Sequence, residues 1–162
     1  MRPFYMISRA AIVPATNGNC IAMMSVATGT TYQRGYVTKV VVGSAAVAAA
    51  SMTDDTNDYL ITRLTAAVTG GTAIVPTPCD PSMPASALTG TAGAGCHYTS
   101  TGGTPSANGI VFGLNRRATY TFVANPGEEI GSLIAITSGV SLITTTLGTA
   151  GQNLSASMVF QE

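Results

Sequence analysis

The stretch ATYTFVANPGEEIGSLIAITSGVSLITTTLGTAGQNLSASMVFQE, residues 118–162, decides the fold class. It divides into runs of β-branched, aromatic and small residues at 118–123, 133–137, 140–147 and 154–160, which glycine, proline and asparagine separate. Short runs of strand formers bounded by turn residues are typical of antiparallel β proteins. The sequence therefore predicts an all-β, jelly-roll-like β-sandwich of about eight to ten strands.

The first half of the chain continues this pattern. Further strands are predicted at 3–13, 20–26, 36–42 and 59–65, and the polar segment 53–58 predicts a turn. The run 36–42 is nearly continuous in apolar character, which is typical of a central strand covered on both faces. The alanine-rich run 43–51 predicts a strand end that leads to a loop, with a single helical turn as the alternative. At 162 residues, the chain is expected to form one domain.

Residues 70–108 form the most irregular part of the sequence. They contain five of the eight prolines and many glycines. Such a segment predicts an extended loop or arm instead of a regular sheet, and long ordered connections are often functional. We therefore expect a neighbouring subunit to hold this arm in place.

The predicted hydrophobic core draws on every expected strand. It comprises Ile7, Ile21, Val40, Val42, Leu60, Leu64, Val111, Phe112, Tyr120, Phe122, Leu133, Ile136, Leu142, Leu154, Val159 and Phe160.

Charge is scarce and balanced. Charged residues make up 9% of the chain, with seven basic and seven acidic side chains, whereas about 25% is usual for globular domains. This balance lacks the basic footprint of a nucleic-acid binder, and no apolar stretch reaches the length of a membrane-spanning helix. Residues 1–9 lack the continuous apolar core of a signal peptide, which predicts synthesis in a cytoplasm. A neutral surface also favours association.

Reactive chemistry is not evident in the sequence. The three cysteines, Cys20, Cys79 and Cys96, are widely spaced beside a single histidine, His97, so no zinc site is predicted. Free thiols are expected, with a disulfide between Cys79 and Cys96 as the alternative. There is no nucleophile elbow, and His97 is interpreted as a satisfied or surface histidine.

The sequence also contains acidic and glycine-rich motifs that could form ligand sites. Asp54, Asp55 and Asp58 are interpreted as a solvated turn, with an irregular, weak calcium site as the alternative. Glu128 and Glu129 are neighbours whose side chains would point apart in a strand. The glycine-rich passages 90–95 and 102–104 lack the features of a phosphate loop and indicate close backbone packing. The sequence thus predicts no catalytic, cofactor-binding or metal-binding residue and no enzyme activity.

Three passages carry a resemblance to a known family. Gly71-Thr72-Ala73 with PTPCDP at 76–81 and Pro84-Ala85, RATYTFVANPGEE at 117–129, and the closing ASMVFQE at 156–162 resemble capsid decoration, or cement, proteins of tailed bacteriophages. The chain departs from the family pattern at Cys79, where leucine is expected, and in the long Thr/Gly-rich insertion 90–108.

This resemblance implies a function. It implies a homotrimeric virion structural protein, made in the host bacterial cytoplasm, that binds the major capsid protein on the outer surface of the head and bridges neighbouring capsomers. Residues 2–9 and the arm 70–108 are then expected to make the contacts, with no nucleic acid, membrane or cofactor involved. Two alternatives are a receptor- or glycan-binding module of a phage tail and a jelly-roll shell-forming capsid protein.

Overall fold

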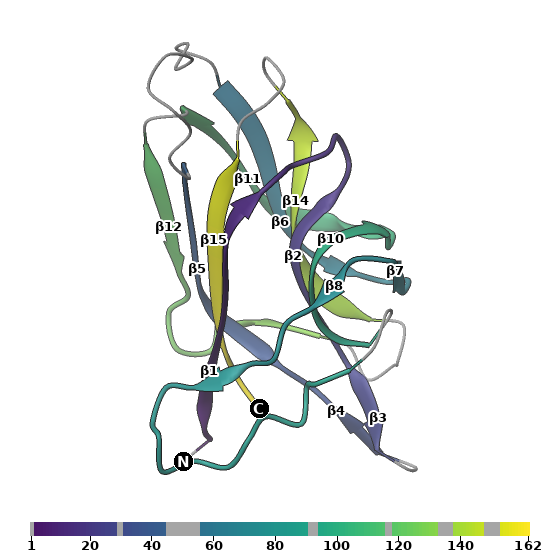
Figure 1. Cartoon of the computed structure of the whole chain (residues 1–162), viewed down its shortest axis with the longest axis vertical. Helices are drawn as coiled ribbons and strands as arrows, with labels where there is room; N and C mark the ends of the chain where they lie inside the picture. The colour runs from purple at the N-terminus through teal and green to yellow at the C-terminus, as the bar shows by residue number, and fades with distance from the viewer. Residues whose placement is uncertain are drawn as a thin grey trace.

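The computed structural model describes residues 2–28, 31–44, 56–90, 94–115, 118–132, 138–147 and 153–162. These residues form strands, turns and loops, and none of them belongs to a helix of the length and apolar character that crossing a bilayer requires. Two β-sheets face each other as layers of a sandwich, as Figure 1 shows.

Sheet A and sheet B, as we call the two layers, are built from strands far apart in the chain. Sheet A has the order β12 (Thr119–Val123), β5 (Tyr36–Ser44), β15 (Leu154–Gln161), β1 (Phe4–Ile12) and β9 (Thr77–Pro78), and β13 (Ile130–Gly131) also pairs with β5. Sheet B has the order β11 (Pro105–Asn115), β6 (Thr56–Leu64), β14 (Gly139–Thr146), β2 (Asn19–Met24), β10 (Gly95–Gly102) and β7 (Val68–Thr69), and β8 (Thr72–Ala73) also pairs with β10. A small separate hairpin joins β3 (Val26–Thr28) and β4 (Thr31–Gln33).

The long strands pair from the two ends of the chain inward. β1 pairs with β15, β2 with β14, β5 with β12, and β6 with β11, all antiparallel. This is the connectivity of one long hairpin that is folded over and wrapped into two layers, so the arrangement is jelly-roll-like. The predicted all-β sandwich is confirmed.

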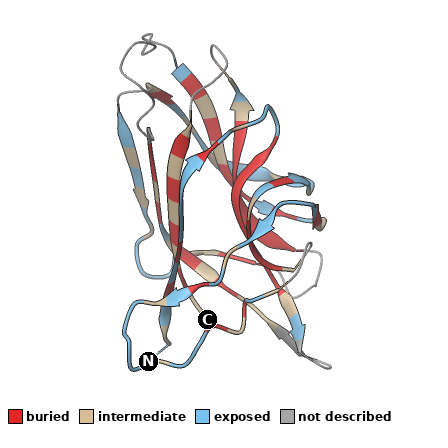
Figure 2. Cartoon of the chain, in the orientation of Figure 1, coloured by how far each residue is buried: buried red, intermediate tan, exposed pale blue. Residues whose placement is uncertain are grey.

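Alternating side chains build the core between the sheets. In β15, Leu154, Ala156, Met158 and Phe160 are buried while the residues between them are half-exposed. The Phe160 ring stacks on Tyr5 of β1 with ring centroids 5.9 Å apart. Figure 2 shows the buried residues concentrated in the central strands of both layers.

The predicted core is confirmed in part. Eight predicted residues are buried, namely Ile7, Ile21, Val40, Val42, Leu64, Leu142, Leu154 and Phe160. Leu60, Phe112, Tyr120, Phe122 and Val159 are half-buried, and Leu133 and Ile136 lie outside the described residues. The prediction for Val111 was wrong. This side chain is 72% exposed, because β11 turns Ile110 and Phe112 inward and Val111 outward.

Two local predictions also need correction. The run 36–42 is not covered on both faces, because Val40 and Val42 are buried while Lys39 is exposed and Val41 is half-buried. The predicted turn at 53–58 is wrong at its end, since β6 already begins at Thr56. Residues 45–55, which include most of the alanine-rich run, lie outside the described residues.

The segment 70–108 is only partly a loop. Residues 95–102 form β10, which pairs with β2 inside sheet B, and residues 105–108 begin β11. The prediction that this segment avoids regular sheet was therefore wrong for its second half. Residues 74–90, hereafter the arm, contain the two-residue strand β9 and otherwise run as a loop beneath the sandwich (Figure 1).

The chain itself holds the arm. Cys79 N–H donates to Phe4 O at 2.9 Å, and the Tyr5 hydroxyl donates to Pro84 O at 3.1 Å. Leu88 is fully buried in the core between the sheets. These contacts hold the arm within the chain, and the expected contact with a neighbouring subunit stays a prediction.

Candidate functional site

The outer face of sheet A is the broadest candidate for an interaction surface. It is formed by the residues of four strands that alternate with the buried ones: Phe4, Met6, Ser8, Lys39, Val41, Gly43, Thr119, Thr121, Val123, Ser155, Ser157 and Val159. Lys39 is the one charged residue in this set. A second molecule could cover this face while removing little charge from water.

This face has both a shallow hollow and exposed apolar side chains. Small residues leave a shallow hollow of about 310 Å³, which Gly43, Ser155 and Ser157 line together with Arg9 of β1. Larger apolar side chains stand out elsewhere: Val123 is 64% exposed and Met6 is 40% exposed. Phe4 and Met6 lie in the segment 2–9, for which we expected partner contacts. Because β1 already pairs with β15 and β9 there, this segment presents side chains and does not lend a strand.

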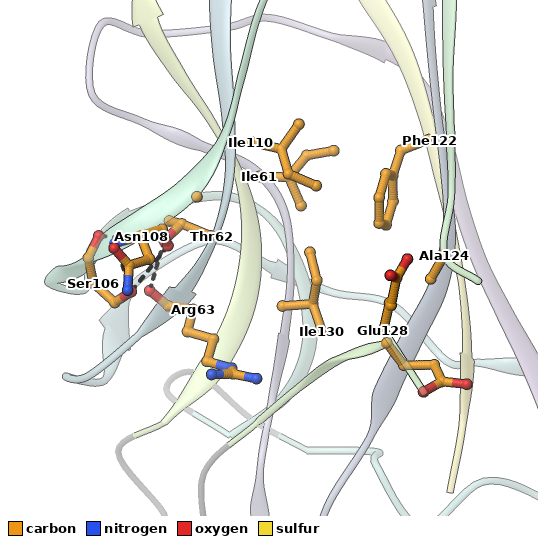
Figure 3. Close-up of a pocket in the computed structure, with 12 residues that line it drawn as sticks. Ile61, Thr62, Arg63, Ser106, Asn108, Ile110, Phe122, Ala124, Glu128 and Ile130 are labelled. Atoms are coloured by element: carbon orange, nitrogen blue, oxygen red, sulfur yellow. Dashed lines mark hydrogen bonds between the residues drawn. The ribbon is translucent and has the colours of Figure 1, made fainter. Parts of the chain in front are cut away.

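A second candidate lies at the side of the sandwich where β11 and β12 end their sheets. The two layers part there and leave a cleft of about 400 Å³, hereafter the edge cleft. Its apolar walls come from Ile61 and Ile110 of sheet B and from Phe122 and Ile130 of sheet A, as Figure 3 shows. This volume falls in the usual range of ligand pockets, roughly 300–1,000 Å³.

An aromatic stack limits the cleft at one end. Phe112 of β11 stacks on Tyr120 of β12 with ring centroids 3.8 Å apart, and on Tyr59 of β6 at 5.6 Å. The stack ties sheet B to sheet A along this edge. Ile110 lies two residues before Phe112 in β11, and Phe122 lies two residues after Tyr120 in β12. Both of these side chains line the open part of the cleft.

A β-bulge shapes the sheet B wall. The pairing of β11 with β6 shifts register between Pro105 and Gly109, so residues 106–108 bulge out of the ladder. The buried Thr62 hydroxyl donates to Asn108 O at 2.9 Å and fixes the bulge. Gly109 is required beside it, because a Cβ there would come within 2.8 Å of Ile61 O. Ser106 and Asn108 consequently line the cleft.

The rim of the edge cleft is charged. Glu128 and Glu129 both line it, and so does Arg63. The two glutamates precede β13 and are not in a strand, so the geometry assumed in the expectation that they would point apart is not present. Asn125 Nδ2 donates to Glu128 at 2.7 Å and Gly127 N–H donates to Glu129 at 3.0 Å. Arg63 Nε donates to a backbone oxygen, Gly131 O, at 2.8 Å.

The remaining candidate residues are His97 and the three aspartates of the segment 53–58. His97 is buried in β10, opposite Ala22 of β2. Asp58 lies in β6, whereas Asp54 and Asp55 fall outside the described residues. Within the part of the chain that the structure describes, no three His, Cys, Asp or Glu side chains gather as metal ligands.

Close backbone packing explains the first glycine-rich passage, as predicted. Gly95 has a φ of +76°, and a Cβ on it would lie 2.6 Å from Gly90 N. Residues 91–93 between them are outside the described ranges.

All three cysteines are free, as expected. Cys20 and Cys96 are buried and Cys79 is exposed on the arm. Burial raises the pKa of the Cys20 thiol to about 11, although its hydrogen bond with Thr144 opposes this shift. Burial, aided by the negative charge of Glu162, also raises the pKa of Cys96. Both buried groups are therefore protonated, poorly nucleophilic thiols at neutral pH.

This difference predicts the thiol reactivity of the native protein. With dithionitrobenzoate at pH 8, we expect one fast-reacting thiol per native chain and three after unfolding. A Cys79→Ser variant should lose the fast reaction entirely. Fast labelling of that variant would show that β2 or β10 opens readily, contrary to the burial of Cys20 and Cys96.

Comparison with known proteins adds no family. No protein-family model matches the chain. Neither a curated protein nor a solved structure matches it at a significant level.

Proposed function

We propose that the chain is a virion structural protein that binds the outer surface of a phage head and bridges neighbouring capsomers. The observation that carries this proposal is the outer face of sheet A, which is broad, partly exposed and poor in charge, with Lys39 on it and Arg9 lining its hollow. Interfaces are depleted of charge at their centre, because each buried unpaired charge costs free energy. A face of this composition suits a protein that acts by adhesion.

The energetics of a cement protein fit this surface. A protein that binds only the assembled shell stabilises it by mass action, and many copies act together. Modest apolar contacts through Met6, Phe4 and Val123 then suffice for each copy. The arm contributes at the same end of the molecule, where Val75 is 75% exposed. In this proposal the protein is a homotrimer and its partner is the major capsid protein.

The jelly-roll-like connectivity favours a second candidate, a subunit that forms a shell by itself. Solution mass and electron microscopy of the purified chain separate the two. A cement protein stays a small oligomer and decorates heads of the phage that encodes it. Closed shells formed by the chain alone would favour the second candidate.

The outer face of sheet A can be tested by charge insertion. We expect the double substitution Met6→Glu with Val123→Glu to reduce occupancy on heads at least about tenfold, because two carboxylates would be desolvated at the interface. The free energy of unfolding should change by less than about 1 kcal/mol, since both side chains are substantially exposed. Occupancy is measured by quantitative gel analysis of purified particles.

Val111→Glu is the matched control. Val111 is an equally exposed valine on an edge strand, but it belongs to sheet B. Its replacement should leave occupancy unchanged. Equal losses from the control and the double variant, or undiminished occupancy of the double variant, would remove sheet A as the capsid-binding face.

A further inference from the structure

We infer that the edge cleft receives an extended segment of a partner protein in which an apolar side chain is followed two residues later by lysine or arginine. This site is separate from the outer face of sheet A, so the inference goes beyond the proposed function. Its test uses no capsid, and either proposal can therefore fail alone.

Within the described residues, the two strands that border the cleft are the edges of their sheets. β11 ends sheet B and β12 ends sheet A. Neither PSANGIVFGLN of β11 nor TYTFV of β12 contains a charged residue. Natural proteins usually guard edge strands with charges, proline or covering segments, because free N–H and C=O groups attract other strands. β11 has Pro105 and a bulge at its start, but its residues 109–115 and the whole of β12 contain neither charge nor proline. Such an edge is suited to pairing with an added strand.

The cleft walls provide an apolar anchor site between these edges. Ile110, Phe122 and Ile130 are only half-buried, while Ile61 at the base is fully buried. The Phe112–Tyr120 stack keeps the layers apart beside it at a fixed width. A strand added to this edge directs every second side chain toward one face, so one apolar side chain can enter the cleft.

The rim selects the charge of the partner. Glu128 and Glu129 give two negative charges against one positive charge from Arg63, which leaves a net charge of −1. Asn125 and Gly127 hold the two carboxylates in place, and Arg63 Nε is engaged with a backbone carbonyl. A cation beside the apolar anchor is therefore favoured. The next side chain on the same face of an extended segment is two residues away.

The partner is a different protein and not a second copy. Among aliphatic residues, Ile7, Val37, Ile61 and Leu114 precede a lysine or arginine by two positions in this chain. All four side chains are buried in the core of their own chain. A folded second copy could offer them only by unfolding locally.

The test is selection from a random octapeptide display library against the full chain. The wild-type chain should enrich sequences with an apolar residue followed at the second position by lysine or arginine. The charge-reversed variant Glu128→Lys with Glu129→Lys should enrich acidic residues at that position and bind the wild-type peptides at least about tenfold more weakly. Glu128 is exposed and Glu129 is half-buried, so both changes should spare the fold.

Ile110→Asp tests the apolar site. Once circular dichroism shows it folded, it should bind the selected peptides at least about tenfold more weakly, and amide NMR shifts on the wild-type chain should map to residues 108–110 and 122–130. The inference is overturned by identical sequences from both charge forms, by undiminished binding to Ile110→Asp, or by no enrichment. Concentration-dependent shifts in the cleft without peptide would instead identify a second copy as the occupant and also overturn it.

Discussion

Replacing Glu162 with alanine is expected to lower the free energy of unfolding by about 3 kcal/mol and to release the arm. The Glu162 carboxylate accepts hydrogen bonds from the Ser86 hydroxyl and from the N–H groups of Ala87, at 3.1 Å, and Leu88, at 3.2 Å. Alanine would leave these donors without their charged acceptor beside the buried Leu88 side chain. Urea unfolding measures the stability, and limited proteolysis with thermolysin measures cleavage within residues 74–90.

Two variants make this result specific. Glu162→Gln keeps one acceptor oxygen but turns a donor toward the arm, so its effect should be intermediate. Glu128→Ala removes an exposed carboxylate and should cost less than about 0.5 kcal/mol. If Glu162→Ala leaves both stability and cleavage unchanged, the carboxylate is not what holds the arm.

The second large effect is expected at Asn19, where alanine should cost about 2 to 4 kcal/mol. Asn19 is buried, and its Nδ2 donates to Gly102 O at 2.9 Å, while its Oδ1 accepts from the Ser141 hydroxyl at 2.8 Å. One amide thus connects β2 with β10 on one side and with β14 on the other. Its loss leaves buried polar groups unsatisfied, which is measured by urea unfolding and by faster hydrogen exchange in β10.

Ser100→Ala is the matched control in β10, at the position that pairs with Asn19. The Ser100 hydroxyl is buried and, within the described residues, has no hydrogen-bond partner. Removing it should therefore be neutral or slightly stabilising. Similar losses from Asn19→Ala and Ser100→Ala would indicate that packing, and not the amide hydrogen bonds, holds β10 in the sheet.

The segment that contains β10 makes the two sides of the sandwich different. Residues 65–104 connect β6 to β11, the innermost pair of the folded hairpin. This connection adds β10 and β7 to one side of sheet B and β9 to the same side of sheet A. That side is therefore extended, whereas within the described residues no further strand pairs with β11 or β12 on the opposite side. The edge cleft follows from this asymmetry.

The amino-acid sequence by itself determined the class of the fold and the position of most strands. Runs such as 154–160 show alternation and β-branched residues bounded by glycine and asparagine, and these signals act over a few neighbouring residues. The burial of Leu154 and Phe160 was predicted from that local pattern, whereas Val159 is half-buried and its neighbour Met158 is buried in its place. Where the pattern was weak, as in residues 95–102, proline and glycine nearby concealed a strand that pairing with β2 stabilises.

Only the tertiary structure decided which strands pair, which edges stay open and which polar residues meet. Glu162 contacts Ser86 across 76 positions of sequence, and Ile110 approaches the edge cleft from a different sheet than Phe122. No local pattern encodes such meetings, because they depend on how the whole hairpin folds over and on a register in which one residue decides the face. Val111 illustrates this: its composition suits a core, and its register places it in solvent.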